Sequence, residues 1–325
     1  MQRNHYFDFL RGIAIIMVIG IHTCGKLGLG NWQEFTSLLI REVINVAVPL
    51  FLTLSAFFLS RKIFNSKEDC IRFWKKHISK VYIPCLIWSL PFFIMGRVMN
   101  GKSIINQSVL LFSGGYSIYY FIPLIIQCYF LLPLLQKCSN IVLGGVSLIV
   151  SLCSAYLISY HGGYRYPFIV YMSPITTWIL FFALGIILGR SERNYRIVSL
   201  VVGVMFTLVL QIAESLYQKS IGVSSPYDCT KPSGFIYSAI FIVLIFSKQI
   251  ELWYVSHRIR FIEYIGEISF ALYLGHCYLI LALNASDYTM PFAIKWLAVL
   301  SLSIVCVFLL RKIIINKTIR NIIGL

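Results

Sequence analysis

The chain has 325 residues, of which 58% are hydrophobic and only 12% are charged. A soluble protein carries about 25% charged residues, so this composition, with a mean hydropathy of +0.80, excludes an ordinary soluble domain. The net charge of +16 is typical of nucleic-acid-binding proteins, but Lys and Arg also collect on the cytoplasmic loops of membrane proteins. We therefore expect an integral membrane protein with no nucleic-acid partner.

The apolar runs are about 18 to 20 residues long and lack strict alternation, which favours membrane-spanning α-helices over a β-barrel. The predicted fold is all-α, a polytopic membrane helix bundle of about ten helices that forms a single domain over residues 1–325. In chain order, the predicted spans cover residues 8–26, 41–60, 81–98, 117–136, 140–159, 171–189, 196–216, 232–247, 267–284 and 292–310.

The distribution of basic residues predicts the orientation of these spans. If the N-terminus is cytoplasmic, 20 of the 28 Lys and Arg residues fall on the inward side and eight on the outward side. Because basic residues favour the cytoplasmic side, both termini are expected there, in a multi-pass protein of the cell (inner) membrane.

The widest inward segment, residues 61–80, is strongly basic and rich in aromatic residues. One interpretation is a topology signal combined with an amphipathic helix that lies on anionic membrane lipid. The other is a docking surface for an anionic cytosolic ligand. The two interpretations are compatible, because the segment carries more basic residues than orientation requires.

Nine cysteines are scattered through the chain without a CxxC pair or a zinc-like spacing with histidine. We interpret them as small buried apolar side chains and expect no metal. Cys24 and Cys229 are both expected near the outer side, but nothing in the sequence supports a disulfide between them.

The first predicted span, within "YFDFLRGIAIIMVIGIHTCG" (6–25), contains Asp8, Arg11 and His22. Eleven residues of helix place Arg11 and His22 on one face, about 16 Å apart along the axis, and Asp8 can pair with Arg11. Two structural explanations are also possible: Asp8 and Arg11 can form an ion pair at the membrane interface, and His22 can form a hydrogen bond to a neighbouring helix. The shared face favours a stripe that lines the interior of the bundle.

The stretch "FDFLRGIAIIMVIGIH" resembles the first helix of membrane acyltransferase family 3, whose members acylate cell-surface carbohydrates. The first helix of that family carries an Asp–x–x–Arg element and a histidine eleven residues after the arginine. Asp8, Arg11 and His22 occupy those places.

Further stretches resemble the same family in order along the chain. They are "VPLFLTLSAFFLSRKI" (48–63), "FWKKHISKVYIPCLIW" (73–88), "YSIYYFIPLIIQCYFLLPLL" (116–135), "TWILFFALGIILGR" (177–190) and "YIGEISFALYLGHCYLI" (264–280). Ser55 is kept in the first, where Ala56 replaces the usual glycine and predicts a looser helix contact. Ser117 and Tyr119 replace the usual His and Trp in the third.

The resemblance implies an O-acyltransferase that moves an acyl group, acetyl in the simplest case, from cytosolic acyl-CoA to a hydroxyl of a surface or envelope glycan. His22 would be the base or a covalent acyl carrier. Arg11 would orient the donor, and Asp8 would fix its guanidinium. The donor phosphates would favour the basic inner loop, and the candidates there are Arg72, Lys75, Lys76 and Lys80. The expected partners are membrane lipids, acyl-CoA and the glycan acceptor, with no permanently bound cofactor.

For the other candidate site residues, a purely structural role is a stronger alternative than it is for Asp8, Arg11 and His22. Ser55, Ser269, Tyr273 and His276 match family positions, but hydrogen bonding between helices would also explain them. Glu42 borders the expected outer mouth and can bind a sugar hydroxyl or reach the interface. Among whole functions, a secondary transporter or flippase of a small solute or glycan precursor is the main alternative, because intramembrane Arg and His suit a carrier as well. A third is the membrane half of a sensor or amino-acid-handling system.

Overall fold

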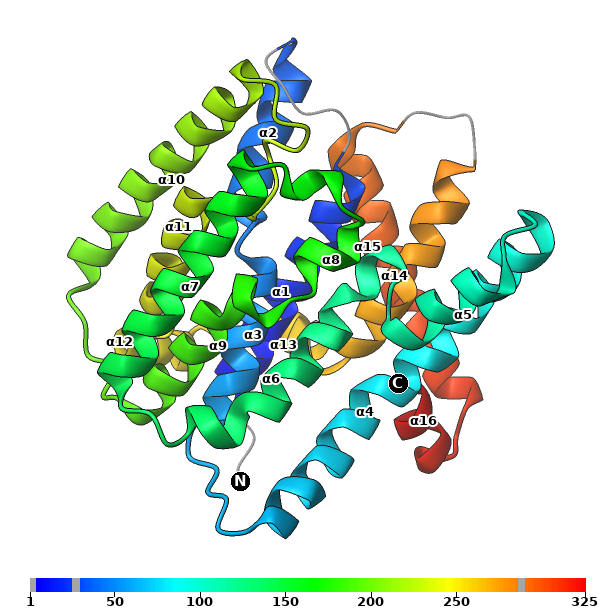
Figure 1. Cartoon of the computed structure of the whole chain (residues 1–325), viewed down its shortest axis with the longest axis horizontal. Coiled ribbons are helices and arrows are strands. Elements are labelled where there is room, and N and C mark those ends of the chain that lie inside the picture. The colour runs from blue at the N-terminus through cyan, green and yellow to red at the C-terminus, as the bar shows by residue number, and fades with distance from the viewer. Residues whose placement is uncertain (1–3, 25–29, 286–289) are drawn as a thin grey trace.

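The structure is a computed structural model that describes residues 4–24, 30–285 and 290–325 (Figure 1). These residues form helices and connecting loops, without a β-strand among them. The α-helices are α1 (His5–Thr23), α2 (Trp32–Ile44), α3 (Ala47–Leu59), α4 (Lys67–Ile94), α5 (Ile104–Ser113), α6 (Phe121–Leu135), α7 (Asn140–Tyr160), α8 (Phe168–Met172), α9 (Ile175–Arg190), α10 (Ile197–Ser220), α11 (Pro232–Ile245), α12 (Lys248–Ser256), α13 (Arg260–Glu267), α14 (Ser269–Asn284), α15 (Phe292–Ile313) and α16 (Lys317–Ile323). A π-helical turn (Met95–Met99) and two short 3₁₀ segments (Ser117–Tyr120 and Gly163–Arg165) complete the order.

Within the described ranges, eight helical stretches are long and apolar enough to cross a membrane, and up to ten if each bent pair is one span. The two bent pairs are α11 with α12, bent by 55°, and α13 with α14, bent by 79°. The prediction of an all-helical, multi-pass membrane bundle is therefore confirmed. In the described part of the chain, each predicted span falls on one of these stretches, and residues 41–60 are divided between α2 and α3. The last two residues of the predicted span 8–26 lie outside the described residues.

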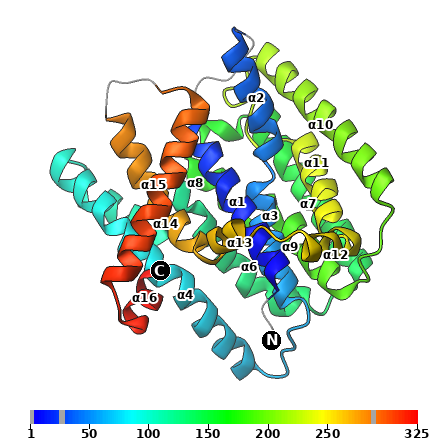
Figure 2. The same ribbon diagram turned by 180° about the vertical axis from the view of Figure 1, so that it is seen from behind.

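The helices form a buried centre surrounded by a lipid-facing shell. In α1, 67% of the apolar window is buried inside the bundle, whereas in α10 and α15 only 17% is buried. Figures 1 and 2 show α1 and α3 in the middle, α10 on one flank, and α4 and α15 on the other. A polar side chain on α1 therefore faces protein or a cavity more readily than lipid.

Close backbone contacts fix the central helices. A Cβ at Gly266 of α13 would lie 1.8 Å from the carbonyl oxygen of Asp8 on α1, so this crossing requires a glycine. A Cβ at Gly185 of α9 would lie 2.3 Å from the carbonyl oxygen of Thr53 and 2.7 Å from the Cβ of Ala56. The looser contact predicted at Ala56 is therefore wrong, because a glycine on the opposite helix makes room for the methyl group.

The basic inner segment does not form a helix of its own. It is continuous with the third predicted span in α4, which starts after the N-cap residue Ser66. The Ser66 hydroxyl accepts a hydrogen bond from the Asp69 backbone N–H, and the Asp69 carboxylate accepts one from the Ser66 backbone N–H. This reciprocal pair is a capping box. The helix expected within residues 61–80 is therefore present as the first part of α4, and its contact with anionic lipid stays a prediction.

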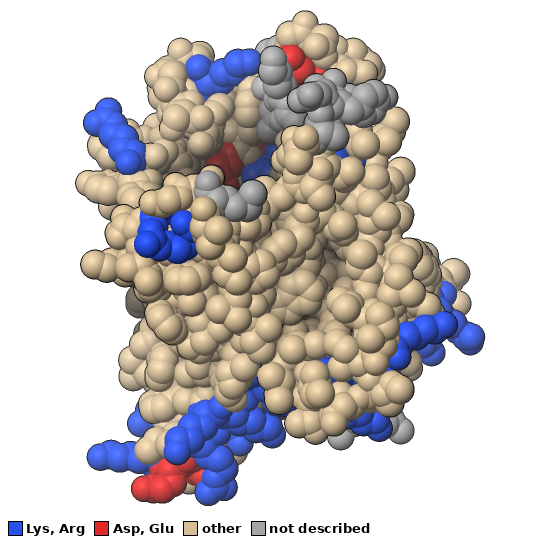
Figure 3. Space-filling model, turned by 90° about the vertical axis from the view of Figure 1, so that its right-hand side faces the viewer, with Lys and Arg blue, Asp and Glu red and all other residues tan. Residues whose placement is uncertain are grey.

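Charged side chains lie mainly at the two ends of the bundle (Figure 3). A broad band of uncharged side chains lies between these ends, as expected for a surface that contacts hydrocarbon. The larger group of Lys and Arg is at the lower end, where the N-terminus also lies in Figure 1. This asymmetry is the basis of the predicted cytoplasmic N-terminus, which stays a prediction.

Candidate active site

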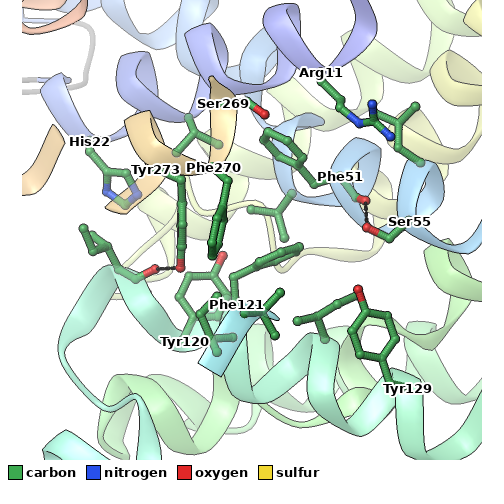
Figure 4. A pocket seen from close by; sticks show the side chains of 17 residues that line it. Arg11, His22, Phe51, Ser55, Tyr120, Phe121, Tyr129, Ser269, Phe270 and Tyr273 are labelled. Atoms are coloured by element: carbon green, nitrogen blue, oxygen red, sulfur yellow. Dashed lines mark hydrogen bonds between the residues drawn. The ribbon is translucent and has the colours of Figure 1, made fainter. Parts of the chain in front are cut away.

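A cavity of about 190 Å³ lies inside the bundle and is lined by residues of α1, α3, α4, α6, α14 and the segment before α6 (Figure 4). Its lining is mostly apolar and aromatic, as in ligand sites that hold a few polar groups in fixed positions. Five of the sequence-predicted candidates line it: Arg11, His22, Ser55, Ser269 and Tyr273. Among the lining residues that the sequence did not suggest are Val81, Ile125 and Tyr129.

Arg11 and His22 project from the same side of α1 into the cavity, at its opposite ends (Figure 4). Both side chains are partly buried. The shared face that the eleven-residue spacing predicts is therefore present. The catalytic roles of the two residues remain predictions.

Asp8 holds Arg11 rather than lining the cavity. One Asp8 carboxylate oxygen accepts a hydrogen bond from Arg11 Nη1 at 2.9 Å, and the Asp8 side chain is only 9% exposed. The close approach of Gly266 to the Asp8 backbone buries this turn of α1. The Arg11 guanidinium also lies 4.9 Å from the centre of the Phe58 ring. Arg11 is thus held on two sides and still reaches the cavity.

His22 also lines a second cavity, of about 370 Å³. That cavity is lined mainly by apolar and aromatic side chains: Phe92, Gly115, Tyr116, Ile118, Cys277, Ile280 and Leu281. It lies toward the outer end of α1, away from Arg11, because His22 is in the last turn of that helix. His22 therefore lies where two cavities meet. Following the predicted orientation, we call the one shared with Arg11 the inner cavity and the other the outer cavity.

Two further residues adjoin His22. The ring of His276 on α14 is 5.5 Å from the His22 ring, centre to centre, and His276 is fully buried. Arg41 of α2 donates through Nη1 to the carbonyl oxygen of Ile21 at 2.9 Å and lies 4.0 Å from the Asp228 carboxylate. The sequence suggested His276 as a candidate but did not suggest Arg41. Only the fold brings α2 and the loop at Asp228 to this end of α1.

Two of the candidate hydroxyls are engaged in structural hydrogen bonds. The Tyr273 hydroxyl donates to the carbonyl oxygen of Ile118 at 2.6 Å, and the Ser55 hydroxyl donates to that of Phe51 at 2.9 Å. Tyr273 therefore joins α14 to the segment before α6, as the helix-bonding alternative predicts. Ser269 is buried at the cavity wall.

The four basic candidates for donor binding do not line the cavity. Arg72, Lys75, Lys76 and Lys80 are exposed along the first part of α4. The same part of α4 approaches the cavity through aromatic residues, since the ring of His77 lies 5.7 Å from the ring of the cavity residue Tyr129. The basic face therefore lies beside the inner side of the cavity, on the same helix as the cavity residue Val81.

The two cysteines considered for an outer disulfide are both free. Burial raises the pKa of the Cys229 thiol well above its usual value, and the neighbouring Asp228 carboxylate raises it further. Burial also raises the pKa of the Cys24 thiol, although the Arg41 guanidinium acts in the opposite direction. Both thiols are therefore protonated at neutral pH and are poor nucleophiles. No group of His, Cys, Asp and Glu that suits a metal ion is found in the described part of the chain.

A second ion pair, which the sequence did not predict, lies deep in the outer half of the bundle. The Lys231 ammonium donates to both carboxylate oxygens of Glu42 at 2.9 Å, and both side chains are 0% exposed. Ser215 and Gln211 of α10 add hydrogen bonds to the same carboxylate. Glu42 is thus paired within the protein and does not border an open mouth. It lies next to Arg41 in the sequence, but it has a different role.

Comparison with known proteins gives one curated relative at a significant level, the serine/alanine racemase of Enterococcus gallinarum. It is 25% identical over an alignment of 343 positions, which covers 96% of this chain and 47% of the relative. The chain thus spans about half the length of the curated relative that it matches. No solved structure matches. A family model described as an acyltransferase domain matches residues 4–312, nearly the whole chain. The chain therefore belongs to acyltransferase family 3.

Proposed function

We propose that the chain is an integral membrane O-acyltransferase that moves an acyl group, acetyl in the simplest case, from cytosolic acyl-CoA to a glycan hydroxyl. The observation that carries this proposal is the position of His22, which lines both an inner cavity shared with Arg11 and a separate outer cavity. A donor and an acceptor can then reach one imidazole from opposite sides.

The inner side suits the donor. Coenzyme A carries phosphates, and the exposed basic face of α4 offers Arg72, Lys75, Lys76 and Lys80 as cations for them. Arg11, fixed by Asp8, lies farther along the path and can donate to a carbonyl oxygen of the pantetheine arm. The cavity between Arg11 and His22 is mostly apolar, which suits a slender uncharged pantetheine arm.

The outer side suits an acceptor with an apolar face. Tyr116 and Phe92 line the outer cavity, and their rings are stacked with centres 5.6 Å apart. Sugar rings present C–H faces that pack on aromatic side chains, so a surface or envelope glycan, or its lipid-linked precursor, is the proposed acceptor. Its hydroxyl would reach His22 from this cavity.

The chemistry needs only a nitrogen lone pair on His22. As a base, His22 takes the proton of the acceptor hydroxyl while its oxygen attacks the thioester carbon. The carbon–sulfur bond then breaks, and the thiolate of coenzyme A takes the proton from the imidazolium. As a carrier, the imidazole itself attacks the thioester and releases the thiolate, and the acceptor hydroxyl then attacks the acyl-imidazole and releases its proton to that thiolate. Both routes give an ester and coenzyme A, and both need an unprotonated nitrogen that faces the cavities.

The test uses purified protein in proteoliposomes with labelled acetyl-CoA, together with the mass of envelope glycans from expressing and non-expressing cells. His22→Ala is expected to lower transfer by about 10²–10⁴-fold, and Arg11→Ala is expected to weaken it strongly as well. The matched controls His161→Ala and Arg165→Ala change exposed residues outside both cavities and should leave transfer unchanged. Near-normal transfer by His22→Ala would overturn the proposal.

A specific feature favours a second candidate, a transporter of a small solute. Two candidate spans are broken pairs, and broken helices often form transporter binding sites. Both breaks, however, lie between residues 232 and 284, whereas inverted-repeat transporters place them in corresponding positions of two halves. If the protein neither binds nor hydrolyses acetyl-CoA but moves labelled serine or alanine into proteoliposomes, the transporter is correct. We choose these two solutes because the curated relative is a serine/alanine racemase.

A further inference from the structure

His276 lies between the two cavities without lining either of them. On α14, Ser269, Phe270 and Tyr273 line the inner cavity, whereas Cys277 and Ile280 line the outer one. His276 is 0% exposed, and its ring is tilted by 37° against the ring of His22 at a centre-to-centre distance of 5.5 Å. It is therefore placed to act on His22 and not on a bound substrate.

The hydrogen bond that His276 makes determines its tautomer. Its Nδ1 lies 3.0 Å from the carbonyl oxygen of Leu272, one turn earlier on α14. A carbonyl oxygen can only accept, so Nδ1 carries the proton and Nε2 of the neutral ring carries a lone pair. Nε2 is buried and has no hydrogen-bond partner among the described residues. A buried acceptor without a partner is unusual in a folded protein and calls for an explanation.

Three other polar groups around His22 and this part of α14 are already engaged in hydrogen bonds. Arg41 is a cation with donors only, and it already donates to the Ile21 carbonyl. The hydroxyls of Tyr273 and Tyr119 donate to the carbonyls of Ile118 and Leu274. Among these neighbours, Nε2 of His276 is the acceptor that has no hydrogen-bond partner in the described part of the chain.

We propose that His276 is a positioning residue whose Nε2 accepts a hydrogen bond from the ring N–H of His22. A centre-to-centre distance of 5.5 Å between two small rings leaves their facing edges at about hydrogen-bond distance, so a small rotation of either ring closes the bond. His22 is then held in one tautomer, with its other nitrogen unprotonated toward the cavities. This is the orienting logic of catalytic triads, with an imidazole as the third group. The inference rests on the proposed function of His22.

Two matched variants separate this role from a merely structural one. His276→Asn keeps an amide N–H near the Nδ1 position for the Leu272 carbonyl, but it has no acceptor at the Nε2 position. His276→Gln places an amide oxygen near the Nε2 position, but it gives up the bond to Leu272. We expect kcat of His276→Asn to fall about 100-fold, with the KM for acetyl-CoA and the melting temperature unchanged. His276→Gln should retain kcat within about tenfold of wild type.

Either the reverse order of these two variants or equal kcat values for both would overturn the proposal. A second measurement does not depend on how the variants fold or on activity. In wild-type protein labelled with ¹⁵N-histidine, the His22 ring nitrogens should give the chemical shifts of one fixed tautomer. Averaged shifts would overturn the inference even if acyl transfer is confirmed. If the wild type shows a fixed tautomer but no acyl transfer, the proposed function fails and the His22–His276 pairing stands.

Discussion

The Asp8–Arg11 and Glu42–Lys231 ion pairs are built in opposite ways. Asp8 and Arg11 are three residues apart on one helix and are joined by a hydrogen bond of 2.9 Å, and the Arg11 side chain, which lines the cavity, is 36% exposed. Glu42 and Lys231 are 189 residues apart and fully buried. Gln211 and Ser215 donate hydrogen bonds to the Glu42 carboxylate, and the Lys231 ammonium donates to the Ser215 hydroxyl and the Pro226 carbonyl.

The difference separates a functional charge from a structural one. A fully buried ion pair with satisfied hydrogen bonds has no donor or acceptor free to bind a ligand. Removing one partner leaves the other charge buried and uncompensated in a region of low dielectric constant. A pair with one member at a cavity wall can still donate to a ligand. The pair of Glu42 and Lys231 therefore holds α2 against the residues before α11, and we propose that the pair of Asp8 and Arg11 serves the site.

The largest effect is expected from breaking the buried pair. Lys231→Met leaves the Glu42 carboxylate buried without its cation, which should destabilise the protein by about 3–5 kcal/mol. In detergent, this would appear as a strongly lowered melting temperature and a low yield of monodisperse protein.

The double variant Glu42→Gln with Lys231→Met is the matched control, because it removes both charges and keeps similar volumes. It should recover most of the stability, since a neutral replacement of a buried pair is often tolerated. A Lys231→Met protein as stable as wild type would show that the pair is not a structural link.

These two pairs also mark the limit of prediction from the sequence. Asp8, Arg11 and His22 lie on one helix, so helical periodicity alone predicts their common face. The partners Glu42 and Lys231 lie on different elements, and Lys231 is part of a polar stretch that resembles a loop. Nothing local in the sequence indicates that this loop enters the bundle.

The same argument applies to the fold. Long apolar runs determine the spans, which is why every predicted span coincides with an observed helical stretch. The short helices α5, α12, α13 and α16 were not predicted, because they are brief and depend on packing against neighbours. The contacts of His276 and Arg41 with the end of α1 likewise depend on tertiary packing.

A change confined to the cavity pair should alter activity without altering stability. Arg11→Lys keeps the charge but removes the planar guanidinium that bonds Asp8 and reaches the cavity at the same time. We expect a fall in kcat/KM of roughly 10- to 100-fold, because a charge-assisted hydrogen bond is worth about 1.5–3 kcal/mol. The melting temperature should stay near that of wild type, and a large drop would place Arg11 with the structural pair.

Asp8→Asn is expected to have a smaller effect than Arg11→Lys. The amide still offers an oxygen to Arg11, but the attraction between opposite charges is lost. A fall of about tenfold in kcat/KM is expected, equivalent to about 1.4 kcal/mol. In the double variant with Arg11→Lys, the losses should be less than additive, because the two residues act through one contact. Fully additive losses would contradict the view that Asp8 acts by holding Arg11.

The smallest effect is expected at Arg41, which combines features of both pairs. Its side chain and that of Asp228 are 14% and 15% exposed, and their closest charged atoms are 4.0 Å apart, too far for a strong hydrogen bond. The hydrogen bond from Arg41 to the Ile21 carbonyl is the better contact, at 2.9 Å, and it supports the end of α1 that carries His22.

A lysine can keep one such donor, so Arg41→Lys should change the stability and the activation free energy of acyl transfer by about 1 kcal/mol or less. Melting curves and kcat/KM measured on one preparation check this. If transfer by Arg41→Lys falls as far as transfer by His22→Ala while the melting temperature stays unchanged, the Arg41 guanidinium contacts the substrate. Arg41 of α2 would then be a functional charge and not a structural one.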